Sequence, residues 1–477
     1  MRRPTCTLLV AALLSGCMVG PDYVRPPVDS PQAFRFAEKD VRDTANTEWW
    51  KQFQDPALDG LIAEALANNR NIRIAVANVE QAAGALQQTR ASFYPQVGYQ
   101  GTGTRQQLSE SDGSPLSSAA PNPRTSYQAL AGASWEIDLW GRIRRLSEAA
   151  QATLFATEQA RRGVVLSLVS TVASSYLQLR GLDQQLEISR RTLAAYAESV
   201  RLFELRFRYG VINQMIVEQA RSQYATAAAQ IPQLESQIAQ TENALSILLG
   251  RNPGPIQRGK SLVQLASPAV PAGLPSDVLE RRPDIAQAEQ QLIAANARIG
   301  AARALYFPTI SLTGTFGGAS AELSDLFSGP ARAWSFAGAL AGPIFTGGAI
   351  AGTVAQAEAA QKAALLGYEL AIQNAFADVE NALVSRTKSA EQLQAQERLV
   401  KSLSEYERLA RLQYDGGFTD YLTVLNAQQQ LFPAELNYTQ VQAQNLNALV
   451  GLYKAMGGGW IVEAERMASQ PAGAPRP

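Results

Sequence analysis

Hydrophobic residues that recur every seven positions form the strongest pattern in the chain. One series is unbroken and consists of Val165, Val172, Leu179, Leu186, Leu193, Val200 and Phe207. A sustained heptad predicts a helix that packs lengthwise against neighbouring helices. A helix from Gly141 to Gly210 would be about 100 Å long, given the rise per residue of an α-helix. Periodicity alone does not distinguish such a helix from part of a soluble coiled coil.

A second heptad series lies in the C-terminal half and is looser. It keeps Ile372, Val379, Leu393, Val400 and Tyr414, whereas Arg386 and Glu407 occupy two positions in register. No proline interrupts residues 124–231 or 344–432, so both stretches favour long helices. We expect two long helices in each half, which meet at a glycine turn at Gly210 and at Gly417.

The two series belong to an internal repeat of about 207 residues. Four landmarks recur in the same order: 91–95 with 304–308, 138–141 with 344–347, 208–210 with 415–417, and 248–250 with 455–457. This shared order predicts that each chain is an internal duplication. The expected first repeat is 55–250, the second is 276–460, and 251–275 is an equatorial linker.

Each repeat also carries two candidate strands. A helix (70–92, then 283–306) runs towards Pro95 or Pro308, which ends it and favours extended backbone. The predicted strands are 96–104 and 127–138 in the first copy, and 309–316 and 334–345 in the second. Polar loops rich in Gly, Ser and Pro, 106–124 and 317–330, separate the strands of each copy.

The number of strands constrains the assembly. Beyond the N-terminus no apolar run approaches the roughly 20 residues of a membrane-spanning helix, so any membrane crossing would use strands. Four strands per chain are too few to close a barrel, and an open sheet in lipid would leave unpaired edges. Three chains around one axis would supply twelve strands. We therefore expect a mixed α and β fold, with a trimeric 12-stranded transmembrane β-barrel continued by a helical tunnel.

The first sixteen residues are typical of a lipoprotein signal peptide. Arg2 and Arg3 precede a short apolar region, and small residues lead into Cys17. Acylation of Cys17 would make it the mature N-terminus, followed by an extended, lipid-anchored segment over 17–54. Met18 follows it in place of the aspartate typical of retention at the inner membrane, which indicates the outer membrane. The remainder, 461–477, is expected to be a flexible tail.

Composition argues against catalysis. The chain has no histidine, and therefore lacks the commonest general base and the commonest metal ligand. Its 42 basic and 42 acidic residues balance, so no global field attracts nucleic acid. We expect no enzymatic activity, no catalytic residue, no metal site and no cofactor apart from the covalent lipid on Cys17.

Several motifs resemble those of the outer membrane factor (TolC-like) family, in its lipoprotein branch of channels for efflux by transporters of the resistance-nodulation-division type. They are Leu279-Glu-Arg-Arg-Pro-Asp-Ile285, Ala297-Arg-Ile-Gly300, Asp55-Pro-Ala-Leu58, Trp135-Glu-Ile-Asp-Leu-Trp-Gly141, Met456-Gly-Gly-Gly-Trp460 and the start at 17–26. The resemblance covers nearly the whole mature chain. Within it, Pro283 and Asp284 suit the first turn of a helix, which explains them without catalysis.

The resemblance implies a homotrimer with a 12-stranded barrel above a 12-helix periplasmic α-barrel. It implies a passive outer-membrane duct of a tripartite efflux pump, which exports drugs or other small molecules. Its partners would be a periplasmic adaptor (membrane fusion) protein and an inner-membrane transporter of the resistance-nodulation-division type. Its location would be the cell outer membrane, with the helices extending into the periplasm.

The resemblance also assigns residues at the periplasmic tips. The implied gate consists of Tyr414, Asp415, Asp420, Leu422, Leu425 and Asn426, and the implied adaptor-docking tips are Gly210, Val211, Gly417 and Phe418. The family often has an acidic residue nine positions after the glycine Gly417, where this chain has Asn426. Asp415 and Asp420 are possible acidic substitutes, or equally solvated surface charges.

Other functions fit parts of the sequence. The same architecture serves as an outer-membrane duct for type I protein secretion, which is the alternative function. A lipid-anchored periplasmic scaffold without a pore would share the helices, and channel conductance would exclude it. The sequence does not name the exported substrates.

Overall fold

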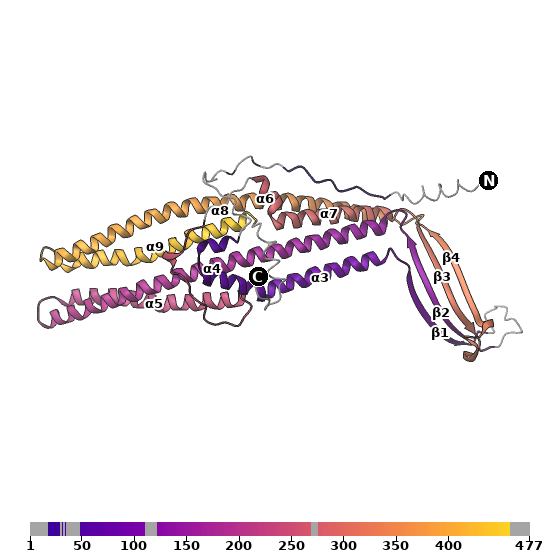
Figure 1. Cartoon of the computed structure of the whole chain (residues 1–477), viewed down its shortest axis with the longest axis horizontal. Helices are drawn as coiled ribbons and strands as arrows, with labels where there is room; N and C mark the ends of the chain where they lie inside the picture. The colour runs from indigo at the N-terminus through magenta and orange to yellow at the C-terminus, as the bar shows by residue number, and fades with distance from the viewer. Residues whose placement is uncertain are drawn as a thin grey trace, which may run out of the picture. The chain divides into compact units, whose positions relative to one another are not determined.

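The computed structural model describes residues 18–28, 31, 34, 48–109, 122–268 and 275–457. The helices in this part of the chain are η1 (Trp49–Phe53), α2 (Pro56–Asn68), α3 (Arg70–Ala91), α4 (Arg142–Arg208), α5 (Gln214–Leu248), η2 (Leu262–Gln264), α6 (Pro275–Arg281), α7 (Pro283–Ala304), η3 (Leu323–Asp325), η4 (Gly329–Ala331), α8 (Ala349–Asp415) and α9 (Tyr421–Ala455). The strands are β1 (Gln96–Gln106), β2 (Arg124–Ile137), β3 (Thr309–Ser320) and β4 (Arg332–Ala341) (Figure 1).

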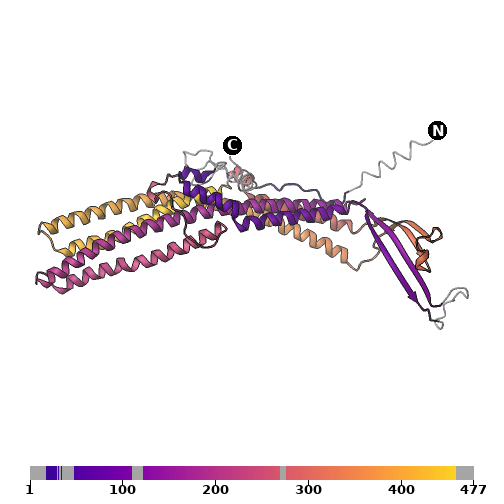
Figure 2. The same ribbon diagram turned by 60° about the horizontal axis from the view of Figure 1, so that its bottom comes forward.

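The two halves of the chain repeat one order of elements. A helix of 22 residues, two strands, a helix of 67 and a helix of 35 occur in each half. The predicted long helices and their glycine turns are confirmed (Figure 2). None of the helices in the described ranges is both long enough and apolar enough to cross a membrane.

The chain folds into two compact units that each draw on both halves. Unit 1 comprises 1–27, 78–157 and 287–368, and unit 2 comprises 28–77, 158–286 and 369–477. Helices α3, α4, α7 and α8 pass from one unit to the other. The repeat boundaries expected from the sequence stay a prediction.

The four strands of unit 1 form one antiparallel sheet in the order β1-β2-β3-β4 (Figures 1 and 2). Two predicted bounds were wrong by four residues each, and the other strand ends that differed were off by three residues or fewer. The end of β4 was expected at Phe345, but the strand stops at Ala341 because Gly342 and Pro343 follow, and proline has no N–H for the ladder. Residues 317–320, expected in a loop, extend β3 because they pair with β2.

The core of unit 2 surrounds the first part of the heptad series. Val165, Val172 and Leu179 are buried in one cluster with residues of α2, α5 and α9. Trp49 is fully buried and stacks on Tyr453, with ring centroids 5.2 Å apart. Leu186, Leu193 and Val200 are only half-buried, and Phe207 is exposed. The heptad pattern therefore runs unbroken along the sequence, but within one chain only its first part is buried.

Candidate functional site

The register of the sheet separates apolar from polar side chains. Residues directly opposite one another share a face, so Tyr99, Ala131, Phe316 and Trp334 form one row across all four strands. The same face carries Val97, Tyr127, Ala129, Ala133, Trp135, Ile137, Ile310, Leu312, Phe336 and Leu340. Its polar members, Arg105, Thr125, Ser320 and Arg332, lie towards the end of the sheet far from α4. Tyr99 and Phe336 are 95% and 80% exposed, so within one chain this apolar face is open.

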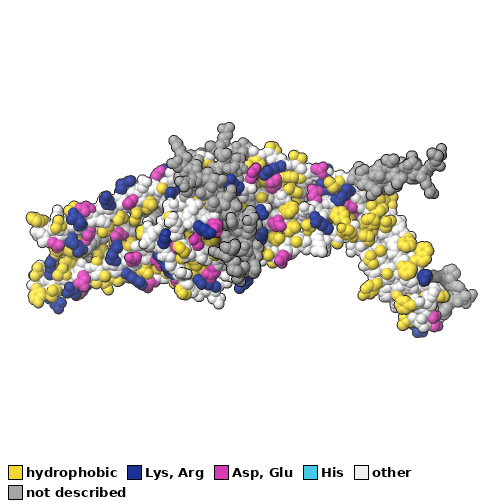
Figure 3. Space-filling model, viewed as in Figure 1, with side chains coloured by type: hydrophobic (Ala, Val, Ile, Leu, Met, Phe, Trp, Pro, Cys, Tyr) yellow, Lys and Arg dark blue, Asp and Glu magenta, His cyan; other side chains and the backbone are white. Residues whose placement is uncertain are grey.

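The opposite face of the sheet is polar. One row across it is Gln96, Ser134, Thr313 and Ala337. Its other polar members are Gln100, Thr102, Thr104, Gln106, Arg124, Ser126, Gln128, Glu136, Thr309, Ser311, Thr315 and Ser335. Charged side chains are sparse along the strands and frequent on the helices (Figure 3). A sheet with one apolar and one hydrated face suits a boundary between lipid and water.

The length and the edges of the sheet complete this description. Its strands have 10 to 14 residues, and about 9–11 tilted residues cross a bilayer. In the described part of the chain, neither the outer edge of β1 nor that of β4 pairs with another strand. Such edges need partners if the sheet enters lipid.

Hydrogen bonds and an aromatic contact hold the junction between β2 and α4. Asp138 accepts hydrogen bonds from the backbone N–H groups of Ile143 and Arg144 at 3.0 and 2.9 Å, and so caps α4. Trp140 donates from Nε1 to the carbonyl of Pro308 at 2.7 Å and stacks on Phe307. These contacts explain the sequence motif over 135–141.

The predicted lipidation site, Cys17, lies outside the described residues, but the segment after it is firmly held. The Val19 N–H donates to the carbonyl of Trp140 at 3.1 Å. Arg145, 2% exposed, donates to the carbonyls of Val19 and Gly20 and to the carboxylate of Asp22 at 2.7 Å. The chain of Gly20 lies so close to α7 that a Cβ there would be 2.3 Å from Gly300 Cα.

The tips that the resemblance assigns to adaptor docking are two similar turns in unit 2. Gly210 and Gly417 have φ angles of 72° and 75°, which favour glycine. In each turn the next residue, Val211 or Phe418, donates its N–H five residues back, closing a Schellman motif. Val211 is 69% and Phe418 87% exposed.

The gate residues do not form one cluster within a chain. Tyr414 is half-buried, accepts a hydrogen bond from Arg206 and packs against Tyr421 with centroids 5.1 Å apart. Asp420 caps α9 by accepting from the Thr423 N–H at 3.3 Å. The other four divide into buried Leu425 and exposed Asp415, Leu422 and Asn426.

Two residues that the sequence did not assign to the gate contact Tyr414. Arg206 comes from α4 and lies 5.5 Å from the Tyr414 ring centroid, a cation–π contact. Tyr421 also packs on Phe203 with centroids 4.1 Å apart, and so joins α9 to α4. The repeat makes Tyr414 the counterpart of Phe207, but no local pattern in the sequence shows that Arg206 contacts Tyr414.

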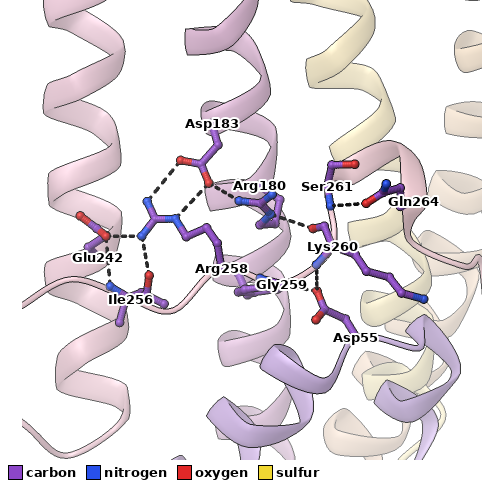
Figure 4. A network of polar contacts seen from close by, with 11 residues as sticks. Asp55, Arg180, Asp183, Glu242, Ile256, Arg258, Gly259, Lys260, Ser261 and Gln264 are labelled. Atoms are coloured by element: carbon purple, nitrogen blue, oxygen red, sulfur yellow. Dashed lines mark hydrogen bonds and ion pairs between the residues drawn. The ribbon is translucent and has the colours of Figure 1, made fainter.

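A polar network fastens residues 256–260 to α4 and α5 (Figure 4). Arg258 binds both Asp183 and Glu242. Burial raises the pKa of Glu242, but the hydrogen bonds from Arg258 and the Ile256 N–H outweigh it, so the net pKa lies below its usual value. Asp55, fully buried, accepts from the Lys260 N–H at 3.1 Å.

Arg282 explains the Arg-Arg-Pro-Asp motif. It donates to Asp284, to Asp378 on α8 at 2.8 Å and to the carbonyl of Ala455 at 3.0 Å. Burial raises the pKa of Asp284, but Arg282 outweighs it and the net pKa is lowered. The motif therefore joins the start of α7 to α8 and α9, which agrees with the structural interpretation from the sequence.

Comparison with known proteins identifies the family. A family profile described as "Outer membrane efflux protein" matches residues 61–251 and 274–458. The chain is 39% identical over 471 residues to the solvent efflux pump outer membrane protein SrpC of Pseudomonas putida, covering 97% of this chain and 99% of that one. It is 37% identical over 469 residues to the cation efflux system protein CusC of Escherichia coli, covering 95% and 99%.

A solved structure supports the same family assignment. The open state of the Neisseria gonorrhoeae MtrE outer membrane channel superposes with a TM-score of 0.84 at 33% identity, covering 93% of this chain and 99% of that one. Both the sequence and the fold thus extend the resemblance over almost the whole chain. The chain belongs to the outer membrane efflux protein family, whose members are channels of the cell outer membrane.

Proposed function

We propose that three copies of the chain form a passive duct for efflux, with a 12-stranded transmembrane β-barrel and a 12-helix periplasmic α-barrel. The observation that carries this proposal is the sheet: four strands, an apolar face, a polar face and two unpaired edges. In a closed ring, β4 of one copy pairs with β1 of the next, and the apolar face meets lipid.

The polar face then lines the pore. Residues such as Gln96, Thr313 and Thr315 present hydroxyl and amide groups to water, and Thr315 and Ser335 hydrogen-bond across the strands at 2.7 Å. Such a wall binds no solute tightly, which suits a passive duct without enzymatic activity. A periplasmic adaptor and an inner-membrane transporter of the resistance-nodulation-division type complete a tripartite pump and supply its energy.

The exported molecules are small. SrpC is named for solvent efflux and CusC for cation efflux, so chains related to this one serve chemically different cargo. We assign the choice of cargo to the transporter and only its conduction to this chain. The exposed turns at Val211 and Phe418 are the surfaces proposed for the adaptor, and the six gate residues are proposed to narrow the pore.

The lipid anchor has structural support. Residues 18–22 are held against Trp140, Arg145 and α7, beside the point where β2 ends and α4 begins. Acyl chains on Cys17 would therefore enter the membrane at the end of the sheet. We propose that Cys17 carries this lipid, and that the chain contains no other cofactor.

Native mass measurement and planar-bilayer recording of the purified protein test the proposal together. Three chains per particle and discrete conductance steps are expected. Folded monomers, or trimers that never conduct, would contradict the duct and favour a scaffold.

A further inference from the structure

A groove in unit 1 has a floor of α7 and walls of α4 and α8. It encloses about 460 Å³, a volume within the range of small-molecule sites. Apolar side chains dominate its lining, including Leu146, Ala301, Leu305 and Ala357. All the lining residues belong to unit 1.

Two guanidinium groups border this groove, and only one of them has a carboxylate partner. Arg142 is bound by Glu136 through two hydrogen bonds, at 3.1 and 2.7 Å. Arg298 is exposed and has no ion pair or hydrogen bond to any residue that the structure describes. No carboxylate lines the groove among the described residues. Its free charge is therefore positive.

The groove opens away from the N-terminal segment. That segment contacts α7 at Asn296, which donates to the carbonyl of Pro21 at 3.0 Å. Arg298 lies two positions on, about 200° around the helix. The partner of Arg142, Glu136, belongs to the polar face of the sheet. If the polar face lines the pore, as the proposed function holds, the groove opens on the channel side. This inference rests on that proposed function.

We propose that this groove is a resting site, on the export path, for small molecules that combine an apolar body with an anionic group. The apolar body is buried between α4, α7 and α8, because its transfer from water is favourable. The anion meets the Arg298 guanidinium, which is planar and permanently charged. Organic cations are disfavoured, since the unpaired Arg298 would repel them.

Two fluorescent probes test the site on the full-length trimer in lipid nanodiscs. Anilinonaphthalene sulfonate is apolar and anionic, and phenylnaphthylamine has a similar aromatic body without the charge. Empty nanodiscs correct for partition into lipid. Arg298→Gln should raise the Kd of the sulfonate about tenfold and leave that of the neutral probe within about twofold.

Two further variants separate the groove from general effects. Arg303→Gln is the matched control, because Arg303 is on α7, loses the same charge, pairs with Glu358 and does not line the groove. It should leave both Kd values unchanged. Ala357→Trp narrows the groove from the α8 wall, where Ala357 is half-buried, and should weaken both probes.

Three results would overturn the proposal: no sulfonate binding above empty nanodiscs, equal effects of Arg298→Gln and Arg303→Gln, or full binding in an Ala357→Trp trimer of unchanged mass. Conductance of the same wild-type preparation reports the proposed function separately. A conducting trimer that fails the probe test refutes only the resting site.

Discussion

Tyr176→Phe should release the segment around Gly259 from α4. The Tyr176 hydroxyl is fully buried, donates to the Asp55 carboxylate at 2.7 Å and accepts the Gly259 N–H at 3.0 Å. Phenylalanine keeps the ring and removes only this oxygen. The substitution therefore tests only the two hydrogen bonds of this hydroxyl, which join the N-cap of α2, the middle of α4 and the segment 256–260.

The magnitude follows from the two hydrogen bonds. A hydrogen bond to a charged acceptor contributes about 1.5–3 kcal/mol, and a buried N–H left without a partner costs about 1–3 kcal/mol. Because Asp55 keeps its bonds from the Ala57 and Lys260 N–H groups, the loss is partial. We expect about 2–4 kcal/mol, which corresponds to roughly 30- to 700-fold in the local opening equilibrium.

Hydrogen–deuterium exchange of the intact trimer measures this opening directly. Amides over 256–262 should exchange faster by that factor, while those of β2 should not change. Tyr224→Phe on α5 is the control, since Tyr224 is exposed. Equal protection of 256–262 in the wild type and in Tyr176→Phe would show that other contacts hold the segment.

Three other substitutions have defined outcomes. Cys17→Ser should abolish incorporation of labelled palmitate, and equal labelling of wild type and variant would refute the lipid anchor. Asn426→Asp should strengthen block by a trivalent cation from the periplasmic side, because three carboxylates attract a counter-cation that three amides do not; tight block of the wild type, unchanged by the substitution, would point to another acidic ring. The pKa of Glu242 is lowered in the folded chain, so its ionised carboxylate stabilises the fold above about pH 4. This stabilisation is lost as the pH falls through the lowered pKa of the folded state. Protection of 251–258 against exchange should then fall in acid, and Glu242→Gln should remove that acid-dependent step; an unchanged acid step in the variant would refute the assignment to Glu242.

The sequence predicted the long elements well because their signals are repetitive. Heptads, the absence of proline and the glycines at 210 and 417 together located α4 and α8 to within a few residues. The end of β4 was misplaced because the pattern of aromatic and small residues continues past Gly342, whereas hydrogen bonding does not. Pro232 and Pro433 lie inside α5 and α9, so packing against neighbours overrides their local preference.

Long-range contacts could not be derived from the sequence. The motif at 55–58 was recognised, but nothing local shows that Asp55 meets Tyr176, which is 121 residues away. Likewise nothing local shows that Arg206 meets Tyr414, which is 208 residues away. The two faces of the sheet follow from strand alternation only once the register is known, and a shift of one residue would exchange them.

Substituted-cysteine labelling along β3 tests the central claim, that this sheet separates lipid from a water-filled pore. Single cysteines at 309–317, in trimers in lipid nanodiscs, are treated with a charged, membrane-impermeant thiol reagent. Thr313 and Thr315 lie on the polar face, and Leu312 and Phe316 on the apolar face. We predict strong labelling at Thr313→Cys and Thr315→Cys and little at Leu312→Cys and Phe316→Cys. Uniform labelling, or the opposite alternation, would contradict the account.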